Sequence, residues 1–311
     1  MKIDDYRKKV FLKLYKKQVD FLDNKKQVGN FVGYQKYFNK ILEFLKPEFL
    51  EASDYLKSDN KILQEDDKLF DNVYVMWWQG MQNAPLLIKN NINKMQTIFG
   101  ENRVHIITQD NWKEFCSISS VIIQKFYDGK ISIAALSDII RFNILKKYGG
   151  LWVDSTVILS ENCKDLLLKY ENKDFFSISN RDQDYHYISK SRWAIWLIGG
   201  KAGYPLFNFI DAFYNLYFEK HNFLIDYYTT DDIIAYFYKT NRKFKEDVDV
   251  NSNDWHPYLL SDNMNELYDK RVIENVKAYP LYGVQKFTYK YDKKLASDSK
   301  TLLYAIINNH F

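Results

Sequence analysis

The chain has 311 residues, of which 46% are hydrophobic and 17% aromatic, enough to build one large folded domain with additions. Its 44 lysines and arginines nearly balance 40 aspartates and glutamates, so the net charge of +4 gives no reason to expect a nucleic-acid partner. The two cysteines, Cys116 and Cys163, are far apart and form no CxxC motif, which argues against a disulfide framework and a zinc knuckle and favours a reducing cytoplasm.

Residues 1–70 are expected to form a helical N-terminal extension. Apolar residues recur at helical spacing from Tyr6 to Leu50, and Pro47 is expected to end the helix. The lysines near the start fit either a packed helix with a solvated basic face or a peripheral contact with the anionic inner leaflet of the cell membrane. We expect neither a signal peptide nor a membrane span, so a cytoplasmic location is predicted.

Alternating strands and helices predict an α/β core over residues 71–250. Buried strands are expected at 73–78 and 104–108, with a helix from Pro85 to Phe99 between them, and this order implies a parallel pair. The later elements expected are a helix at 131–148, a strand at 151–159 interrupted by an aspartate, strands at 175–179 and 194–198, and helices at 205–220 and 231–239. A Tyr-rich segment, 251–311, is expected to complete the core.

Two charged residues interrupt an otherwise apolar helix at Ile133–Leu145. Asp138 and Arg141 are three residues apart and therefore share one face of that helix. Asp138 falls among apolar positions on a helical wheel, so it should point into the protein, where an unpaired charge is costly. The pair is either a buried ion pair that only satisfies itself or part of a ligand site, and these residues alone favour neither interpretation.

A carboxylate follows the strand that comes after a double glycine. In Tyr148-Gly-Gly-Leu-Trp-Val-Asp-Ser-Thr156, Gly149 and Gly150 permit a tight turn from helix to strand, and Asp154 comes where the strand ends. Ligands of open α/β sheets bind at such strand ends. The carboxylate could hold a divalent ion against a diphosphate or accept hydrogen bonds from a ribose; the alternative is an incidental polar residue in a turn.

The order of these residues resembles a known family. The string Ser137-Asp138-x-x-Arg141 followed by Tyr148-Gly-Gly-x-Trp-x-Asp154-x-Thr156 is similar to the sugar-binding DXD region of glycosyltransferase family 32, especially its capsular polysaccharide synthesis branch. The likeness covers most of residues 73–235. Its other parts are Val75-Met-Trp-Trp-Gln-Gly80 with Ala84-Pro85, the segment 104–111, Ser191-Arg-Trp193, Pro205-Leu206 and the segment 226–231.

The resemblance implies a GT-A fold, a nucleotide-binding α/β sandwich with a mostly parallel central sheet, here carrying the N-terminal helices and a mixed, partly helical C-terminal segment. It implies a retaining glycosyltransferase that moves a hexose or N-acetylhexosamine from a nucleotide sugar, expected to be a UDP-sugar, to a lipid-linked oligosaccharide in capsular or exopolysaccharide biosynthesis. No nucleophile is identifiable, so same-face attack with the leaving phosphate as base is the default hypothesis. Charge stabilisation at the phosphate and the sugar ring would then supply the catalysis.

Roles for individual residues follow from the same resemblance. The catalytic residues would be Asp138, Arg141 and Asp154, and Trp77 or Trp78 would stack on or border the nucleotide base. Acceptor or sugar contacts are expected from Trp193 and Asp231, and Trp196 is either a further cleft residue or part of the core. The full set expected at the donor is Trp77, Trp78, Gln79, Ser137, Asp138, Arg141, Gly149, Gly150 and Asp154.

The expected metal site departs from the family pattern. Mn²⁺ or Mg²⁺ is expected on Asp154 and Thr156, but Thr156 stands where the pattern has a second acid. The ion would then depend on donor phosphates, water and a distant side chain. The candidates for that side chain are Asp231, Asp232, His256 and His310, each more commonly a surface or structural residue. The incomplete motif also keeps a second hypothesis open, a catalytically silent sugar-binding or assembly protein of a capsule-synthesis machinery.

Overall fold

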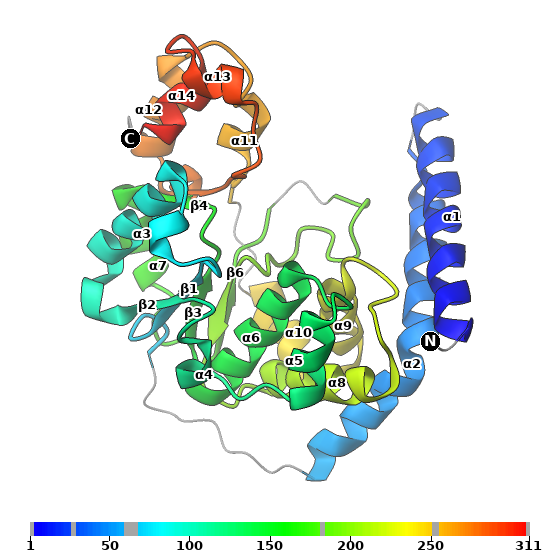
Figure 1. Ribbon diagram of the computed structural model, residues 1–311. Helices are drawn as coiled ribbons and strands as arrows, with labels where there is room; N and C mark the ends of the chain where they lie inside the picture. The colour runs from blue at the N-terminus through cyan, green and yellow to red at the C-terminus, as the bar shows by residue number, and fades with distance from the viewer. Residues whose placement is uncertain (1–2, 26–28, 59–67, 181–183, 251–254, 309–311) are drawn as a thin grey trace.

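The computed structural model describes residues 3–25, 29–58, 68–180, 184–250 and 255–308. An α/β body occupies the middle of the molecule, two long N-terminal helices lie along one side of it, and a small C-terminal unit sits above the end of the sheet (Figure 1). Among the described residues, the main sheet has the strand order β2-β1-β3-β6-β5, and a second sheet pairs β4 with β7.

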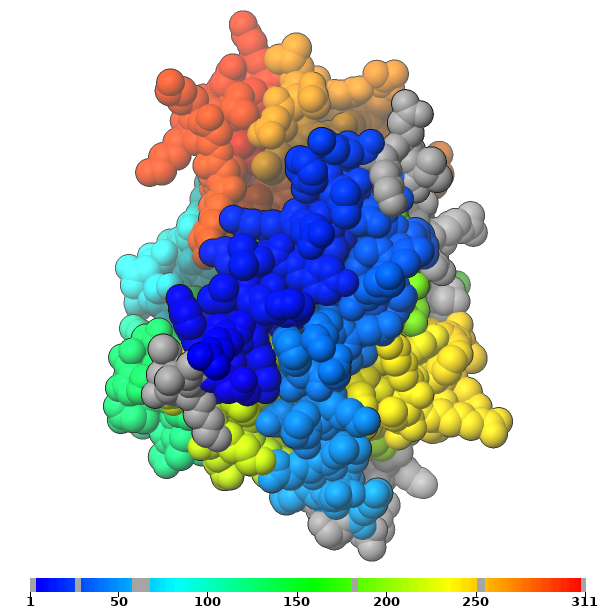
Figure 2. Space-filling model, turned by 90° about the vertical axis from the view of Figure 1, so that its right-hand side faces the viewer, coloured from blue at the N-terminus to red at the C-terminus, as the bar shows by residue number. Residues whose placement is uncertain are grey.

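The N-terminal extension consists of α1 (Ile3–Lys25) and α2 (Phe31–Ser58), which pack together on the outer face of the molecule (Figure 2). The expectation that Pro47 ends the helix is wrong, because α2 continues to Ser58. Phe49 is fully buried and contacts the rings of Phe209 and Phe213 on α8 (Pro205–Lys220). This packing on α8 offsets the backbone hydrogen bond that proline cannot donate.

The main sheet is mixed rather than mostly parallel. β1 (Val73–Met76) pairs in parallel with β2 (Val104–Ile107) and with β3 (Gly150–Val153). The reversed strand is β6 (Leu197–Gly200), antiparallel both to β3 and to β5 (Phe175–Ser177). The described residues between β5 and β6, 178–180 and 184–196, contain no crossover helix, and a return without such a helix fits an antiparallel pair.

Side chains of the sheet alternate between two apolar clusters. Val73 and Val75 face the cluster that contains α3 (Leu86–Phe99), whereas Tyr74 faces the cluster that contains α6 (Ile133–Tyr148) and α8. This period of two is the signature of a strand buried on both faces. The cluster that contains α6 and α8 also includes residues of α1, α2 and α9 (Thr229–Thr240), so the N-terminal helices share the core of the body.

The expected strand over 151–159 is divided in two. The turn at residues 154–156 leaves the main sheet, and β4 (Val157–Leu159) pairs with β7 (Val284–Lys286) in the small sheet. The remaining helices are α4 (Trp112–Phe115), α5 (Ser120–Tyr127), α7 (Lys164–Leu168), α10 (Arg242–Val250), α11 (Leu259–Asn263), α12 (Lys270–Ala278), α13 (Lys293–Ser297) and α14 (Leu302–Ile307). Short 3₁₀ turns occupy Met81–Asn83, Glu101–Arg103, Glu161–Cys163 and Pro280–Tyr282.

Candidate functional site

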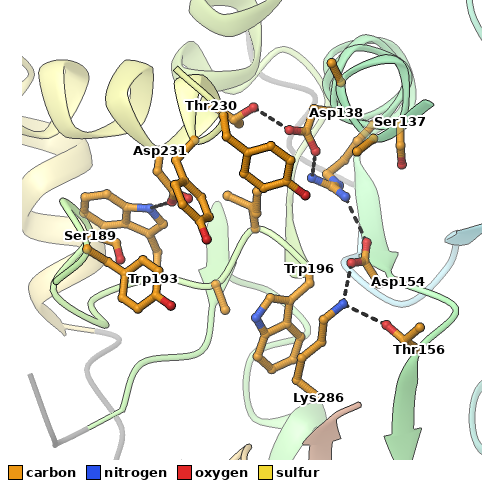
Figure 3. A pocket seen from close by; sticks show the side chains of 18 of the residues that line it. Ser137, Asp138, Asp154, Thr156, Ser189, Trp193, Trp196, Thr230, Asp231 and Lys286 are labelled. Atoms are coloured by element: carbon orange, nitrogen blue, oxygen red, sulfur yellow. Dashed lines mark hydrogen bonds and ion pairs between the residues drawn. The ribbon is translucent and has the colours of Figure 1, made fainter. Parts of the chain in front are cut away.

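A cavity of about 1840 Å³ opens where the parallel strands β1 and β3 end. Met76, the last residue of β1, the turn Asp154–Thr156 and Arg141 of α6 line it. Ser137 and Asp138 of α6 lie on the same side of the cavity as Asp154 and Thr156 (Figure 3). The other walls include the loop before β6, residues of the segment 223–231, and residues 286–290, which begin at the last residue of β7. The cavity is therefore at the strand ends where the sequence predicted a ligand site.

Arg141 joins two carboxylates at this wall. Its side chain is 3% exposed, and its two terminal nitrogens donate to Asp138 Oδ1 at 2.6 Å and to Asp154 Oδ1 at 2.9 Å. The guanidinium also lies over the ring of Trp152, 4.9 Å from its centroid, and Trp152 Nε1 donates to Asp154 Oδ1 at 2.9 Å. The structure thus brings together the three residues that the sequence assigned to one site, from two different elements.

Asp138 has further partners that the sequence did not identify. The hydroxyl of Thr230, on α9, donates to Asp138 Oδ2 at 2.6 Å and shares a second hydrogen bond of 2.6 Å with the hydroxyl of Tyr214. Burial raises the pKa of Asp138, and the positive charge of Arg141 opposes this rise. Asp138 is therefore held in place from two helices, with its charge compensated by Arg141.

Lys286, the last residue of β7, completes the cluster. Its Nζ donates to Asp154 Oδ2 at 2.7 Å and to Thr156 Oγ1 at 2.8 Å, across 132 and 130 residues of sequence. The register that pairs Val157 with Lys286 in the small sheet brings the two segments together. Burial by itself raises the pKa of Asp154, but the charges of Lys286 and Arg141 outweigh it and hold that pKa below its ordinary value.

The side chains around Asp154 do not fit a divalent cation. One carboxylate oxygen accepts from Arg141 and Trp152, and the other accepts from Lys286, which also engages the Thr156 hydroxyl. An ion such as Mn²⁺ or Mg²⁺ needs these same oxygens as ligands and would lie beside two positive charges. The arrangement puts a protein ammonium where the sequence predicted the ion.

The residues considered as distant metal ligands do not gather at Asp154. Asp231 lines the cavity, whereas Asp232 borders a smaller adjoining pocket and His256 stacks on Tyr282. His310 lies outside the described residues. Throughout the described part of the chain, no three His, Cys, Asp or Glu side chains are grouped so that they could hold a metal ion.

Trp193 and Asp231 meet on the opposite side of the cavity. Trp193 Nε1 donates to Asp231 Oδ1 at 2.7 Å, and both residues line the cavity (Figure 3). Burial raises the pKa of Asp231 to about 7, and the neighbouring charges of Asp138 and Asp226 contribute to the rise. A carboxyl group that titrates near neutral pH at a cavity wall is suited to exchange a proton with a ligand.

Comparison with known proteins decides the family. A family profile described as capsular polysaccharide synthesis protein matches residues 21–306. The chain belongs to this family. Membership suggests a role in capsule biosynthesis, and the matched region contains the whole cluster from Asp138 to Lys286. No curated protein and no solved structure matches the chain. Within the described ranges, no helix has the length and apolar character of a membrane span.

Two glycines of the expected donor site lie away from the cavity. Gly149 and Gly150 are at the start of β3, and Asp154 follows its other end. Gly150 has φ +94°, and a Cβ there would lie 2.4 Å from the carbonyl oxygen of Asn72 on the segment before β1. The glycines thus serve the close approach of two backbones, and the ligand cavity lies elsewhere.

The Trp77-Trp78-Gln79 segment follows β1 but does not line the cavity. The ring of Trp77 packs edge-on against Tyr289, a cavity residue, with centroids 5.3 Å apart. Trp78 packs against Phe126 at 5.6 Å. Trp77 is therefore one ring away from the cavity wall, and a contact of this segment with a nucleotide base stays a prediction.

Proposed function

We propose that this protein is a glycosyltransferase that transfers a hexose or N-acetylhexosamine from a nucleotide sugar, most simply a UDP-sugar, to a lipid-linked oligosaccharide of the capsule. The observation that carries the proposal is the linked row of Asp138, Arg141, Asp154 and Lys286 on one wall of a cavity at the strand ends. The likeness of this region to the DXD region of glycosyltransferase family 32, with its GT-A fold and retaining chemistry, supports the same reaction.

The charges in the row suit the two developing charges of glycosyl transfer. When the bond between the anomeric carbon and the phosphate oxygen breaks, negative charge grows on the leaving diphosphate and positive charge on the sugar ring. Arg141 and Lys286 supply fixed positive charge, and Asp138 and Asp154 supply carboxylates that accept hydrogen bonds from sugar hydroxyls. Because all four side chains are already held by one another, little reorganisation is needed when the charges develop.

The cavity has room and surfaces for both substrates. Its volume of about 1840 Å³ exceeds what one small ligand occupies. Trp193 and Trp196 line it together with Asp231, and indole rings stack on the apolar faces of sugars. We assign the side of Trp193 and Asp231 to the acceptor. In the retaining reaction, the acceptor oxygen attacks the face that the diphosphate leaves, and its proton passes to the leaving phosphate.

The test begins with a thermal-shift screen of nucleotide sugars, because a ligand of the folded state raises the melting temperature. Release of nucleoside diphosphate is then measured for the sugars that bind. Asp154→Asn is expected to lose turnover while keeping its circular dichroism spectrum. Asp211→Asn is the matched control, since Asp211 forms a buried ion pair with Lys146 at 2.7 Å outside the cavity lining.

Two results would count against the proposal. Wild-type turnover by Asp154→Asn would show that the assigned site is wrong. Binding of a nucleotide sugar without any release of nucleoside diphosphate, with or without a lipid-linked acceptor, would support the catalytically silent sugar-binding protein instead. Nuclear magnetic resonance of the product tests the stereochemistry, and an α-linked product from an α-configured donor is expected.

A further inference from the structure

We propose that the ammonium of Lys286 takes the place of a divalent cation and binds the donor diphosphate directly, so that this site works without a metal. The inference rests on the proposed function, because it assigns the group that meets the leaving diphosphate. It follows from the position of Lys286 between Asp154 and Thr156, the two residues that the sequence pattern assigns to the metal.

The ammonium of Lys286 is held in the site by strand pairing and by hydrogen bonds. Lys286 is the last residue of β7, whose pairing with β4 fixes its backbone beside Val157. Its side chain is 24% exposed and its Nζ lies 5.7 Å from the ring centroid of Trp196. An ammonium has three hydrogens to donate, and no described residue accepts the one left after Asp154 and Thr156. That hydrogen is available to a phosphate oxygen in the cavity that Lys286 lines.

In the reaction, Lys286 changes only its contacts. The bond from the anomeric carbon to the phosphate oxygen breaks and its electron pair stays on the diphosphate. The acceptor oxygen forms the new bond to the anomeric carbon, and its proton moves to the leaving phosphate. Lys286 donates to the diphosphate oxygens throughout, so no external ion is required to balance the charge that accumulates there.

The test measures binding of UDP and of inorganic pyrophosphate by calorimetry, in EDTA and in MnCl₂. Wild-type protein is expected to bind UDP equally well in both. Lys286→Gln should weaken binding by about tenfold to a hundredfold in EDTA, the loss of a hydrogen bond to a charged group, whereas Lys286→Arg should recover part of it. The matched control is Lys94→Gln, because Lys94 has a similar exposure of 23% and an ion pair with Glu161 outside the cavity lining.

A Mn²⁺ titration followed by electron paramagnetic resonance measures binding of the cation separately from binding of the donor. In wild-type protein, Asp154→Asn should not change Mn²⁺ binding. Lys286→Ala should gain Mn²⁺ binding that depends on Asp154, because it frees Asp154 Oδ2 and the Thr156 hydroxyl. Two results would overturn the inference. The first is Mn²⁺ binding by the wild type that depends on Asp154. The second is UDP binding that is abolished by EDTA but unchanged by Lys286→Gln. Failure of every nucleoside diphosphate to bind would instead refute the proposed function, and the Mn²⁺ titration would still decide the role of Lys286.

A second observation, independent of the cavity, concerns the outer face of α1. Four apolar side chains on this helix form an exposed stripe, with exposures of 54% for Tyr6, 38% for Val10, 62% for Leu14 and 57% for Phe21. Their spacing of four, four and seven residues places them on one face of the helix. We infer that this face of α1 rests on an anionic lipid surface.

Charge supports a lipid occupant for the stripe. Among the residues of α1 that are described as exposed, the acidic one is Asp4, and the basic ones are Arg7, Lys9, Lys13, Lys17 and Lys25. An apolar stripe bordered by basic side chains is the pattern of helices that lie in the headgroup region of a membrane. Lys9 also lines the large cavity and lies over the ring of Phe223, so a membrane on this face would be next to the cavity.

Co-sedimentation with vesicles tests this surface. Full-length protein is expected to bind phosphatidylglycerol-containing vesicles at low salt and to be released by high salt, since the Debye length shortens. The double variant Leu14→Ser/Phe21→Ser should bind about tenfold less or weaker still. The matched control carries Val250→Ser and Leu267→Ser, which remove side chains 74% and 72% exposed elsewhere. The inference of a lipid-binding face would be overturned if the two double variants bound vesicles equally. It would also be overturned if light scattering showed an α1-dependent dimer and the protein did not bind vesicles.

Discussion

Replacing Arg141 by methionine removes the cation between Asp138 and Asp154 but keeps an unbranched chain that can lie over Trp152. The arginine side chain is 3% exposed, so water cannot take its place at either carboxylate without rearrangement. The variant therefore measures how much the folded state depends on compensation of two partly buried negative charges.

The expected cost follows from the partners that remain. Removing one member of a buried ion pair costs about 3–5 kcal/mol. Here Asp154 retains Lys286, and Asp138 retains Thr230 and can take up a proton, because burial already raises its pKa. We therefore expect Arg141→Met to lower the free energy of unfolding by about 3 kcal/mol, the lower end of that range.

Urea unfolding at two pH values tests both the size and the origin of this cost. In the variant, the folded-state pKa of Asp138 should rise further above its unfolded value, so the folded form loses stability as pH increases towards that pKa. The cost of Arg141→Met should be larger at pH 8 than at pH 5. Arg242→Met is the control, since the Arg242 side chain is 92% exposed in its ion pair with Glu246 and its replacement should change the free energy of unfolding little. Equal losses in the two variants, or a cost independent of pH, would refute the reasoning.

Two further predictions concern pH. Burial raises the pKa of Asp231 to about 7, so ionising this carboxyl group lowers the stability of the folded state as pH rises from its unfolded pKa of 3.8 towards 7. Across this pH range, the melting temperature should therefore decline less for Asp231→Asn than for the wild type. Identical declines in the two proteins would contradict the raised pKa. His221 bonds Asp5 on α1 at 2.8 Å and Glu48 on α2 at 3.0 Å, which outweighs its burial and raises its pKa above 6.5. The stability that His221 contributes should be present below pH 6.5 and lost as pH rises above its folded-state pKa. Protease cleavage of α1 in the wild type should therefore increase above that pKa. A cleavage rate that does not depend on pH would refute this prediction.

Local sequence patterns predicted the positions of Asp138, Arg141 and Asp154 within their own elements, and the resemblance to glycosyltransferase family 32 placed the three in one site. A spacing of three places the first two on one face of a helix, and a charge on an apolar face must find a partner. Asp154 follows a strand that is parallel to β1, so it lies at the edge of the sheet where ligands bind. These two placements need only the geometry of one helix and one strand, whereas the meeting of the two elements was expected from the family resemblance.

Pairings between distant segments could not be predicted in the same way. Lys286 reaches Asp154 across 132 residues, through a strand of only three residues in a segment of mixed character. Thr230 reaches Asp138 across 92 residues, and nothing in the spacing of α9 selects this hydroxyl over its neighbour Thr229. The path of α2 through Pro47 depends likewise on packing against α8, which a local rule about proline does not include.

The neutral side chain at position 156 becomes intelligible once Lys286 is in place. With threonine there, the row contains two carboxylates and two cations, Asp138 and Asp154 against Arg141 and Lys286, and its charges cancel. A second carboxylate at position 156 would leave a net negative charge that repels a diphosphate unless a divalent ion were added. With Thr156, Lys286 can turn part of its hydrogen bonding towards a phosphate, because Arg141 still compensates Asp154. The departure from the DXD pattern and the distant lysine are thus two parts of one charge arrangement, which explains how the site could bind a diphosphate with its own side chains.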